Sequence, residues 1–425
     1  MIEFIPIIAI TWFAYFIRNN RINNPMVGLI FLSYLFFATN YSDFGLDLNF
    51  DIFRSLHRLI GIACILMFFV YALKNRVNIL NEWVPRIMIL YMLTLLFSFI
   101  GNDIYLENYI HYVRNFVFIS LINLFLYYKL DSDAKLDELF KLIGMATLLL
   151  SFFVLIQIFY KGWGGRENLF FNNLNYLAIA LLPGFTILLF SQIKYWQILS
   201  LLVLVSIFAT GSRAVELSVV FILCLFLFAN IKRFNKNYLI VFLLILMTTL
   251  VLFFDQIVFK QKIDGTRLVI SKIVLNVFSE NPVNGIGYGQ FRTHFYQYID
   301  QDIIDMQNYE FQDAIQSFDE SVSDEELLFK GITFRPLEKM THNDFYTVIA
   351  ELGLVGLVFL IFLFYKLYAE LKKLLLHSRN NFFLSIGLIG GSLVFSLFHN
   401  NLTSFVFWFI LFVPFIMNRN YERTT

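Results

Sequence analysis

Runs of about 15–22 apolar residues, separated by short polar segments, make up most of the chain. A bilayer core about 30 Å thick needs a helix of this length, and the backbone amides in lipid must find partners within their own segment. The pattern therefore predicts an all-α, polytopic helical membrane protein with about twelve or thirteen transmembrane helices. The expected spans lie near residues 3–17, 26–40, 59–73, 84–100, 110–128, 138–160, 173–191, 195–210, 214–230, 238–254, 346–365, 382–398 and 402–417.

One long polar segment, residues 255–345, interrupts this pattern. It predicts a three-part organisation. Residues 1–254 would form a transmembrane bundle of about ten spans, and residues 255–345 a loop domain. Residues 346–425 would supply the last transmembrane helices and a tail.

Lysine and arginine in the short loops predict the orientation. One set of alternate loops holds 18 basic residues and the opposite set holds five. The richer set should face the cytoplasm, which places the amino terminus and the 255–345 loop outside and the carboxyl terminus inside.

The hydrophobic content, net charge and cysteine positions of the chain limit the classes of function to be expected. The 425 residues are 59% hydrophobic and 15% charged, with a mean hydropathy of +0.69 and a net charge of +1. A near-neutral balance gives no reason to expect nucleic acid as a partner. Cys64 and Cys224 both fall inside expected spans, where we interpret them as small core side chains without disulfide chemistry.

The long loop carries three patterns. Residues 264–279 place Ile270, Ile273, Val274 and Val277 on one helical face, which predicts an amphipathic helix on the outer membrane surface. The glycines Gly285, Gly287 and Gly289 alternate, so backbone amides could approach an anion, although an ordinary glycine turn explains the same spacing. Residues 300–326 hold ten acidic side chains and no basic ones. A solvated acidic face explains them better than a divalent-cation site, since no calcium-loop spacing is present.

Four arginines gather on the predicted outer side, where basic residues are scarce: Arg114, Arg166, Arg213 and Arg267. Guanidinium grips phosphate oxygens in a bidentate manner and keeps its charge, so this cluster fits a lipid-linked phosphate or pyrophosphate. Each arginine also has a plainer explanation, in which Arg213 extends to the lipid headgroups or pairs with Glu216 one turn on.

His342 precedes the span that contains Glu351. A histidine at a span end can act as a base or merely contact headgroups. If 341–365 is one continuous helix, Glu351 points away from His342 and packs on another span or forms a structural ion pair.

Several motifs, taken in order, resemble the bacterial O-antigen ligase and O-antigen polymerase family. They are Gly211-Ser212-Arg213, the stretch from Asn281 to Phe291, and Thr341-His342-Asn343-Asp344-Phe345 followed by Glu351-Leu352-Gly353-Leu354-Val355-Gly356. Arg166 with the stretch Phe170 to Ala178 is similar to an earlier exterior loop of that family. The resemblance extends over roughly residues 160–365.

The resemblance implies a metal-independent, inverting membrane glycosyltransferase without a cofactor, in the cytoplasmic (inner) membrane with its active site on the extracytoplasmic side. The donor would be a glycan on undecaprenyl pyrophosphate. The acceptor would be a lipid-linked repeat unit or a lipid A core, with a chain-length regulator as a conceivable further partner. The reaction needs cationic groups to stabilise charge on the pyrophosphate and a base near the acceptor hydroxyl. We therefore assign catalysis to His342, Arg213 and Arg267, and substrate binding to Arg166, Asn175, Arg114, Gly285, Gly287 and Asn343.

Two reactions remain open within this family. A polymerase joins lipid-linked repeats, whereas a ligase transfers the glycan to another acceptor; the absence of an evident protein acceptor or large extra domain favours the polymerase. A lipid-linked glycan transporter is the alternative of another class. Transporters concentrate ionisable residues near the bilayer midplane, whereas here they gather at one face. A membrane scaffold would leave the arginines unexplained.

Overall fold

The computed structural model describes residues 27–31, 51–76, 79–102, 104–162, 174–191, 193, 195–230, 261–300, 303, 341 and 343–424. Within these ranges the chain forms helices and turns and no strand. The α-helices are α3 (Asp51–Lys74), α4 (Trp83–Phe97), α5 (Leu106–Lys129), α6 (Asp133–Lys161), α7 (Leu174–Phe190), α8 (Trp196–Thr210), α9 (Arg213–Asn230), α11 (Gln261–Glu280), α12 (Phe291–His294), α15 (Asp344–His377), α16 (Arg379–Ser396) and α17 (Phe405–Thr424). Two short 3₁₀ helices, η2 (Ile79–Asn81) and η3 (Phe295–Tyr298), join them.

Among the residues that the structure describes, four helices are long and apolar enough to cross a membrane: Leu106–Lys129, Asp133–Tyr160, Arg213–Asn230 and Asp344–His377. Trp83–Phe97, Asn175–Phe190 and Trp196–Thr210 are shorter apolar helices. The prediction of an all-α polytopic membrane protein is confirmed. The spans expected at 3–17 and 238–254, and most of that at 26–40, lie outside the described residues.

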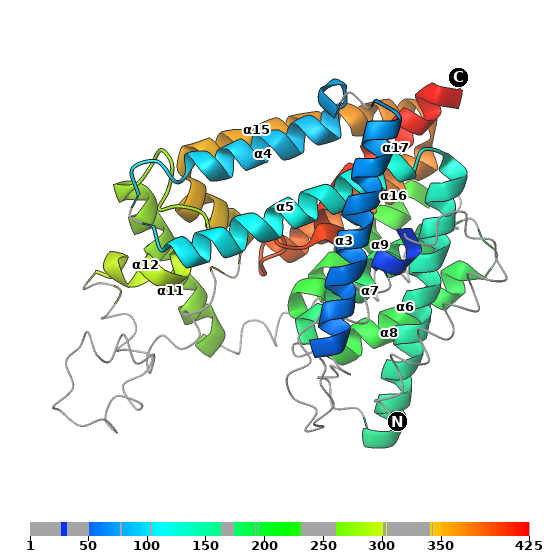
Figure 1. Cartoon of the computed structure of the whole chain (residues 1–425). Helices are drawn as coiled ribbons and strands as arrows, with labels where there is room; N and C mark the ends of the chain where they lie inside the picture. Colours follow the sequence, from blue (N-terminus) through cyan, green and yellow to red (C-terminus); the bar gives the residue numbers. More distant parts are fainter. Residues whose placement is uncertain are drawn as a thin grey trace.

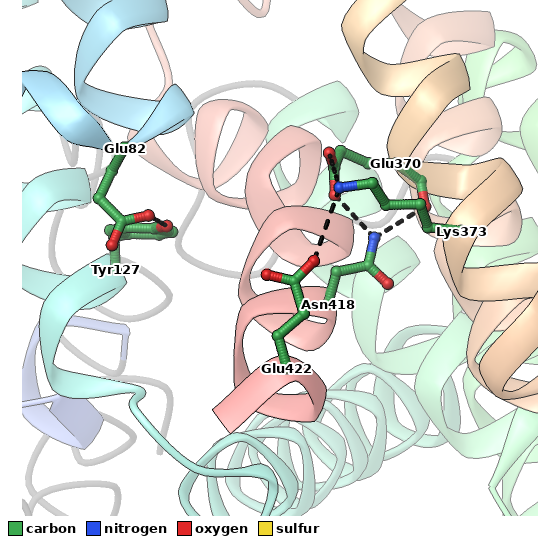
Figure 2. A network of polar contacts seen from close by, with 6 residues as sticks. All are labelled: Glu82, Tyr127, Glu370, Lys373, Asn418 and Glu422. Carbon is green, nitrogen blue, oxygen red and sulfur yellow. Dashed lines mark hydrogen bonds and ion pairs between the residues drawn. The ribbon is translucent and has the colours of Figure 1, made fainter. Parts of the chain in front are cut away.

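α15 is longer than the span predicted at 346–365, because it continues to His377. Its added turns carry polar side chains that find partners. Asn418 of α17 donates to the Glu370 side chain at 2.7 Å, and Lys373 pairs with Glu370 at 3.3 Å and with Glu422 at 3.6 Å (Figure 2). Hydropathy marks where the apolar stretch ends, but the helix itself goes on.

Two contacts define how the helices run around α16. Arg379, in the first turn of α16, donates to the Ala229 carbonyl at the end of α9 (3.3 Å). Asn380 donates to the Phe190 carbonyl at the end of α7 (3.5 Å). α7 and α9 therefore run antiparallel to α16, and both begin beside the place where α16 ends.

α4 and α15 lie side by side along one flank of the molecule (Figure 1). They are antiparallel, since Tyr91 packs against Phe359 (4.7 Å between ring centroids) and Trp83, at the start of α4, packs against Phe362 (6.4 Å). The end of the bundle where α15 begins, α16 ends and α4 turns into α5 is called here the loop end. α11 and α12 lie at this end (Figure 1).

The core of the bundle centres on Trp408 of α17, which is fully buried. Its ring packs against Tyr91 of α4 at 5.0 Å and Phe116 of α5 at 5.6 Å. The indole N–H, which would be costly to leave unpaired in an apolar core, donates to the Leu402 carbonyl at 2.8 Å. This bond ties the turn between α16 and α17 to the core.

α11 forms where the amphipathic pattern predicted a helix. Ile270, Ile273, Val274 and Val277 are all buried. They pack in one cluster with Phe291, Phe295, Ile303 and Ala350. The expected placement of this face on the membrane surface is therefore wrong, because an apolar stripe indicates burial without saying whether lipid or protein covers it.

Candidate active site

The first turn of α15 is fixed to the turn that joins α16 and α17. Asn343 caps the helix: its side-chain oxygen accepts from the backbone N–H of Phe345 (2.8 Å) and of Tyr346 (3.2 Å). The amide nitrogen of the same side chain donates to the Leu397 carbonyl at 2.8 Å. One asparagine thus both starts α15 and holds the end of α16.

Asp344 strengthens this attachment. Its buried carboxylate accepts from the backbone N–H of Asn401 (2.8 Å) and of Leu402 (3.1 Å). On the other side of position 342, the hydroxyl of Thr341 lies 2.6 Å from that of Thr347, which also accepts from the Asn400 amide at 3.2 Å.

His342 itself lies outside the described residues. Both of its chain neighbours, however, are anchored to the α16–α17 turn. The motif Thr341-His342-Asn343-Asp344 therefore carries structural residues on both sides of the expected base. Asp344 was not singled out from the sequence, since its partners lie 57 and 58 residues away.

α15 is broken at Gly353, whose backbone angles (φ 58°, ψ −147°) are not helical. The condition under which Glu351 was oriented, one continuous helix over 341–365, is therefore not met. The break frees the carbonyls of Ala350 and Glu351 from the helical ladder. They accept instead from the backbone N–H of Ile286 (2.9 Å) and Gly287 (3.1 Å) in the glycine loop, residues 282–291.

The same exchange supplies acceptors to the other side of the break. The backbone N–H of Leu354 donates to the Pro282 carbonyl at 2.8 Å, and that of Val355 to the Val283 carbonyl at 3.1 Å. The glycine loop thus fills the gap in the α15 ladder with two donors and two acceptors. A buried backbone group without a partner costs free energy, so this insertion explains how a break inside an apolar helix is tolerated.

The anion bound by the glycine loop is the protein's own carboxylate. Glu351, which is buried, accepts from the backbone N–H of Gly289 (2.9 Å) and of Phe291 (3.1 Å). The expectation that Glu351 packs on another span or forms an ion pair is wrong, because the break in α15 brings the loop within its reach.

Two further amides of the loop also have partners in the chain. The N–H of Gly285 donates to the Asn281 carbonyl at 3.2 Å, and that of Tyr288 to the Ser98 hydroxyl at 3.1 Å. With the Gly287 amide bonded to Glu351, the amides of both glycines expected to bind substrate are engaged internally. We therefore assign Gly285 and Gly287 a structural role.

The connection between α4 and α5 holds the glycine loop from its other side. The Asn102 side chain donates to the Gly285 carbonyl at 2.9 Å. The backbone N–H of Tyr105 donates to the Gln290 side-chain oxygen at 2.9 Å, and the Gln290 amide donates back to the Tyr105 carbonyl at 3.3 Å. Sequence reasoning missed these contacts, because nothing local links residues more than 180 positions apart.

Arg213 opens α9 at the loop end and is half-buried. The hydroxyl of Ser212 donates to the side-chain oxygen of Asn175, in the first turn of α7, at 2.6 Å. The structure thus brings together the starts of α7 and α9, and with them the expected site residues Asn175 and Arg213. Glu216, one turn further on, is buried within electrostatic range of Arg213.

Of the other three predicted arginines, the structure describes the side chain of Arg114 but not those of Arg267 and Arg166. Arg114 is exposed near the start of α5, where its guanidinium lies 3.2 Å from Nδ1 of His111. Arg267 lies on α11, but its side chain is outside the described part of the structure. Arg166 lies outside the described residues altogether.

A small cavity, about 40 Å³ in volume, lies beneath the glycine loop. Its lining residues are Tyr112, Tyr288, Phe291, Thr341, Asp344, Thr347, Glu351, Asn400, Leu402 and Thr403. This volume suits one or two waters rather than a sugar, and the lining includes none of the predicted arginines.

Burial raises the pKa of the Tyr288 phenol well above its ordinary value, so it serves here as a neutral group. Within the described residues, no group of three or more His, Cys, Asp and Glu side chains could hold a metal ion.

Comparison with known proteins concerns the segment that contains most of α8, all of α9 and α11, and the whole glycine loop. Residues 198–318 match a family model described as O-antigen ligase. The match supports membership of the O-antigen ligase and polymerase family. It includes Arg213, Arg267, Gly285 and Gly287, and ends before Asn343. The resemblance stated from the motifs is confirmed. No curated protein matches the chain.

The family match agrees with the presence of apolar helices that are long enough to cross a membrane. The chain is a polytopic helical membrane protein, and over residues 198–318 it is similar to O-antigen ligases, which belong to polysaccharide biosynthesis. Such proteins act on lipid-linked glycans in a membrane environment.

Proposed function

We propose that this protein is a membrane glycosyltransferase that moves a glycan from undecaprenyl pyrophosphate to the hydroxyl of an acceptor sugar. The reaction takes place at the outer face of the cytoplasmic membrane, and the loop end faces outward. The observation that supports this most is the gathering at one end of the bundle of Arg213, Asn175 and the two anchored neighbours of His342.

The distribution of charge supports the proposed orientation. Several basic residues lie at the end opposite the loop end: Lys74 at the end of α3, Arg86 at the start of α4, Lys129 at the end of α5 and Arg379 at the start of α16. Cytoplasmic loops carry such an excess. The loop end would then face the side on which lipid-linked glycans are assembled.

The chemistry is a single displacement. The acceptor oxygen attacks the anomeric carbon, the bond from that carbon to the pyrophosphate oxygen breaks, and undecaprenyl pyrophosphate leaves with the electron pair, inverting the configuration. His342 takes the proton of the acceptor hydroxyl. Arg213 and Arg267, with Arg166 and Asn175 beside them, stabilise the charge that develops on the pyrophosphate. The exposed Arg114 is assigned to the approach of the substrate. No metal is assigned a role.

Substitution of the two principal residues tests the proposal. In purified protein reconstituted in nanodiscs, Arg213→Ala and His342→Ala should each lower turnover of the lipid-linked glycan about 10²–10³-fold. Matched controls at the opposite end are Arg423→Ala and His377→Ala, which remove an exposed arginine and an exposed histidine and should leave turnover unchanged. Wild-type turnover in both site variants would disprove the mechanism. Unchanged turnover in the presence of EDTA is expected of a metal-independent reaction.

Among the family's two reactions we propose the polymerase. In a deletion strain, a polymerase defect leaves single repeats on the surface but no long chains. A ligase defect would instead remove all surface glycan while lipid-linked polymer accumulates. The second pattern would assign the protein as a ligase and leave the donor chemistry as proposed.

A further inference from the structure

Two cations from different helices lie over the ring of Trp83, at the end of the bundle opposite the loop end. The guanidinium carbon of Arg86, one turn along α4, lies 4.9 Å from the ring centroid. The ammonium nitrogen of Lys366, on α15, lies 3.5 Å from the same ring. Contact with the face of an indole is favourable for each cation alone, but here it brings two like charges close together. An anion beside them would offset their repulsion.

The carboxylates nearest to these cations in the chain are directed to other partners. Glu82 lies one turn before the guanidinium, but its carboxylate accepts from the Tyr127 hydroxyl at 2.9 Å. Glu370 lies one turn after the ammonium, but it pairs with Lys373 at 3.3 Å (Figure 2). In the part of the chain that the structure describes, neither cation over the indole forms an ion pair with a carboxylate. The compensating anion is therefore expected to come from a ligand.

Both cations are held in place by contacts that leave donors for such a ligand. Nε of Arg86 donates to the Leu80 carbonyl, and the two Nη groups of this exposed side chain are not used in that bond. Lys366 is half-buried, and the rings of Phe362 and Tyr365 are centred 5.8 and 5.6 Å from its ammonium nitrogen. The Nη groups and the ammonium can therefore donate together to the oxygens of one phosphate.

An exposed apolar stripe on α4 begins at Arg86. Leu90, Leu93 and Phe97 follow at steps of four, three and four residues, so the four side chains share one face of the helix. The three apolar side chains are 38%, 55% and 42% exposed. At about 1.5 Å per residue the stripe is about 16 Å long, close to the thickness of one leaflet of a bilayer. A cationic end with an apolar face of this length matches a lipid headgroup and its acyl chain.

We propose that Arg86 and Lys366 bind the phosphodiester of an acidic phospholipid, whose acyl chain lies along Leu90, Leu93 and Phe97. Basic residues between transmembrane helices recognise acidic headgroups in this way. A zwitterionic lipid fits less well, because its own ammonium already neutralises the phosphate. With the loop end facing outward as proposed, the site lies in the cytoplasmic leaflet. The bound lipid would link α4 to α15 and so stabilise the pair, whether or not the protein transfers a glycan.

Paired substitutions separate this site from a general effect of charge. The site variant combines Arg86→Gln with Lys366→Gln. The matched control combines Lys74→Gln with Lys372→Gln, which removes the same charge from two exposed lysines at the same end of the bundle. Phosphatidylglycerol is the probe, and phosphatidylcholine with identical acyl chains is its zwitterionic counterpart. Native mass spectrometry of the protein in detergent measures the bound lipid, and the melting temperature measures the stabilisation that the lipid provides.

We expect the wild type to bind phosphatidylglycerol more tightly than phosphatidylcholine and to melt at a higher temperature in its presence. The site variant should bind phosphatidylglycerol about 10- to 100-fold more weakly, and the control variant as the wild type does. Equal losses in both variants would reduce the effect to net charge and overturn the proposal.

Two measurements on the wild type test the proposal even if a variant fails to fold. Equal binding of the two lipids would contradict recognition of an acidic headgroup. Stabilisation by glycerol phosphate as large as that by phosphatidylglycerol would indicate a site for a soluble anion and overturn the assignment to a lipid.

Discussion

Glu351 and Gly289, 62 residues apart in the chain, are joined by a hydrogen bond of 2.9 Å from the backbone N–H to the buried carboxylate. Together with the second bond from Phe291, it attaches the glycine loop to α15 just before the break at Gly353. A loop rich in glycine is thereby held in one conformation next to the proposed site.

Replacing the carboxylate by an amide should loosen this attachment. Glu351→Gln keeps the shape but turns one acceptor into a donor, which then faces the N–H of Gly289 or Phe291. We expect a loss of about 1–3 kcal/mol in stability, since a buried donor is left without an acceptor. Thermal unfolding in detergent measures it. Glu280→Gln makes the same chemical change at an exposed site at the end of α11 and should be neutral; equal effects in both variants would contradict the assignment.

A side chain at Gly353 should disrupt the break in α15. Its φ of 58° disfavours other residues, and a Cβ would lie 2.6 Å from the Gly285 nitrogen and 2.7 Å from the Val283 oxygen. Gly353→Ala should therefore lose more than the roughly 1–3 kcal/mol that a sparsely populated backbone conformation alone costs. Proteolysis of the glycine loop should accelerate as it detaches.

Gly101→Ala separates the two contributions to that loss. Gly101 has a φ of +80°, but a Cβ placed on it would meet nothing within 4 Å, so a substitution there brings conformational strain without a clash. A loss as large in Gly101→Ala as in Gly353→Ala would show that the insertion of the loop contributes nothing.

Asn343 has two functions that substitution can separate. Asn343→Ala removes the helix cap and the bond to Leu397, and should cost about 1–2 kcal/mol. Asn343→Asp keeps an acceptor for the cap but loses the amide that donates to Leu397, so stability should largely remain while glycan turnover falls. Ser378→Ala, which removes the cap of α16 at the opposite end, should lower stability without that fall in turnover. Full turnover in Asn343→Asp would argue that the bond to Leu397 does not position the site.

The contribution of the Asp300 carboxylate to stability should depend on pH. Hydrogen bonds from the Asn276 side chain (2.9 Å) and the Ile303 N–H (2.9 Å) lower the pKa of this exposed carboxyl below its ordinary 3.8. A carboxyl whose pKa is lowered in the folded state stabilises the fold at pH values above its ordinary, unfolded-state pKa. This contribution is lost as the pH falls through the folded-state pKa. The difference in melting temperature between wild type and Asp300→Asn should therefore shrink between pH 5 and about pH 3. A difference that stays constant over this range would contradict it.

The sequence predicted the elements better than their contacts. Apolar runs identified the helices that the structure describes, and the motifs around Arg213 and Asn343 marked the end of the bundle at which they meet. The partner of Glu351 was missed because helical periodicity was continued through Gly353. A glycine that follows a buried carboxylate could have signalled the break, but the loop that fills it comes from about 65 residues earlier, and no local pattern encodes that pairing. The membrane-facing placement of α11 failed for a related reason, since Ile270 and Val274 show only that they are buried.

The insertion of the glycine loop beside Gly353 also constrains the order in which segments of the protein assemble in the membrane. Until Ile286 and Gly287 arrive, the carbonyls of Ala350 and Glu351 have no backbone donor, and the hydrocarbon interior of a bilayer offers none. The glycine loop precedes α15 in the chain and therefore leaves the ribosome first. It can already lie at the membrane surface when α15 inserts into the bilayer. With the loop end facing outward as proposed, insertion of the carboxyl-terminal helices would depend on a segment that has already crossed the membrane, so a defect in the loop should cause misinsertion of the helix that follows it.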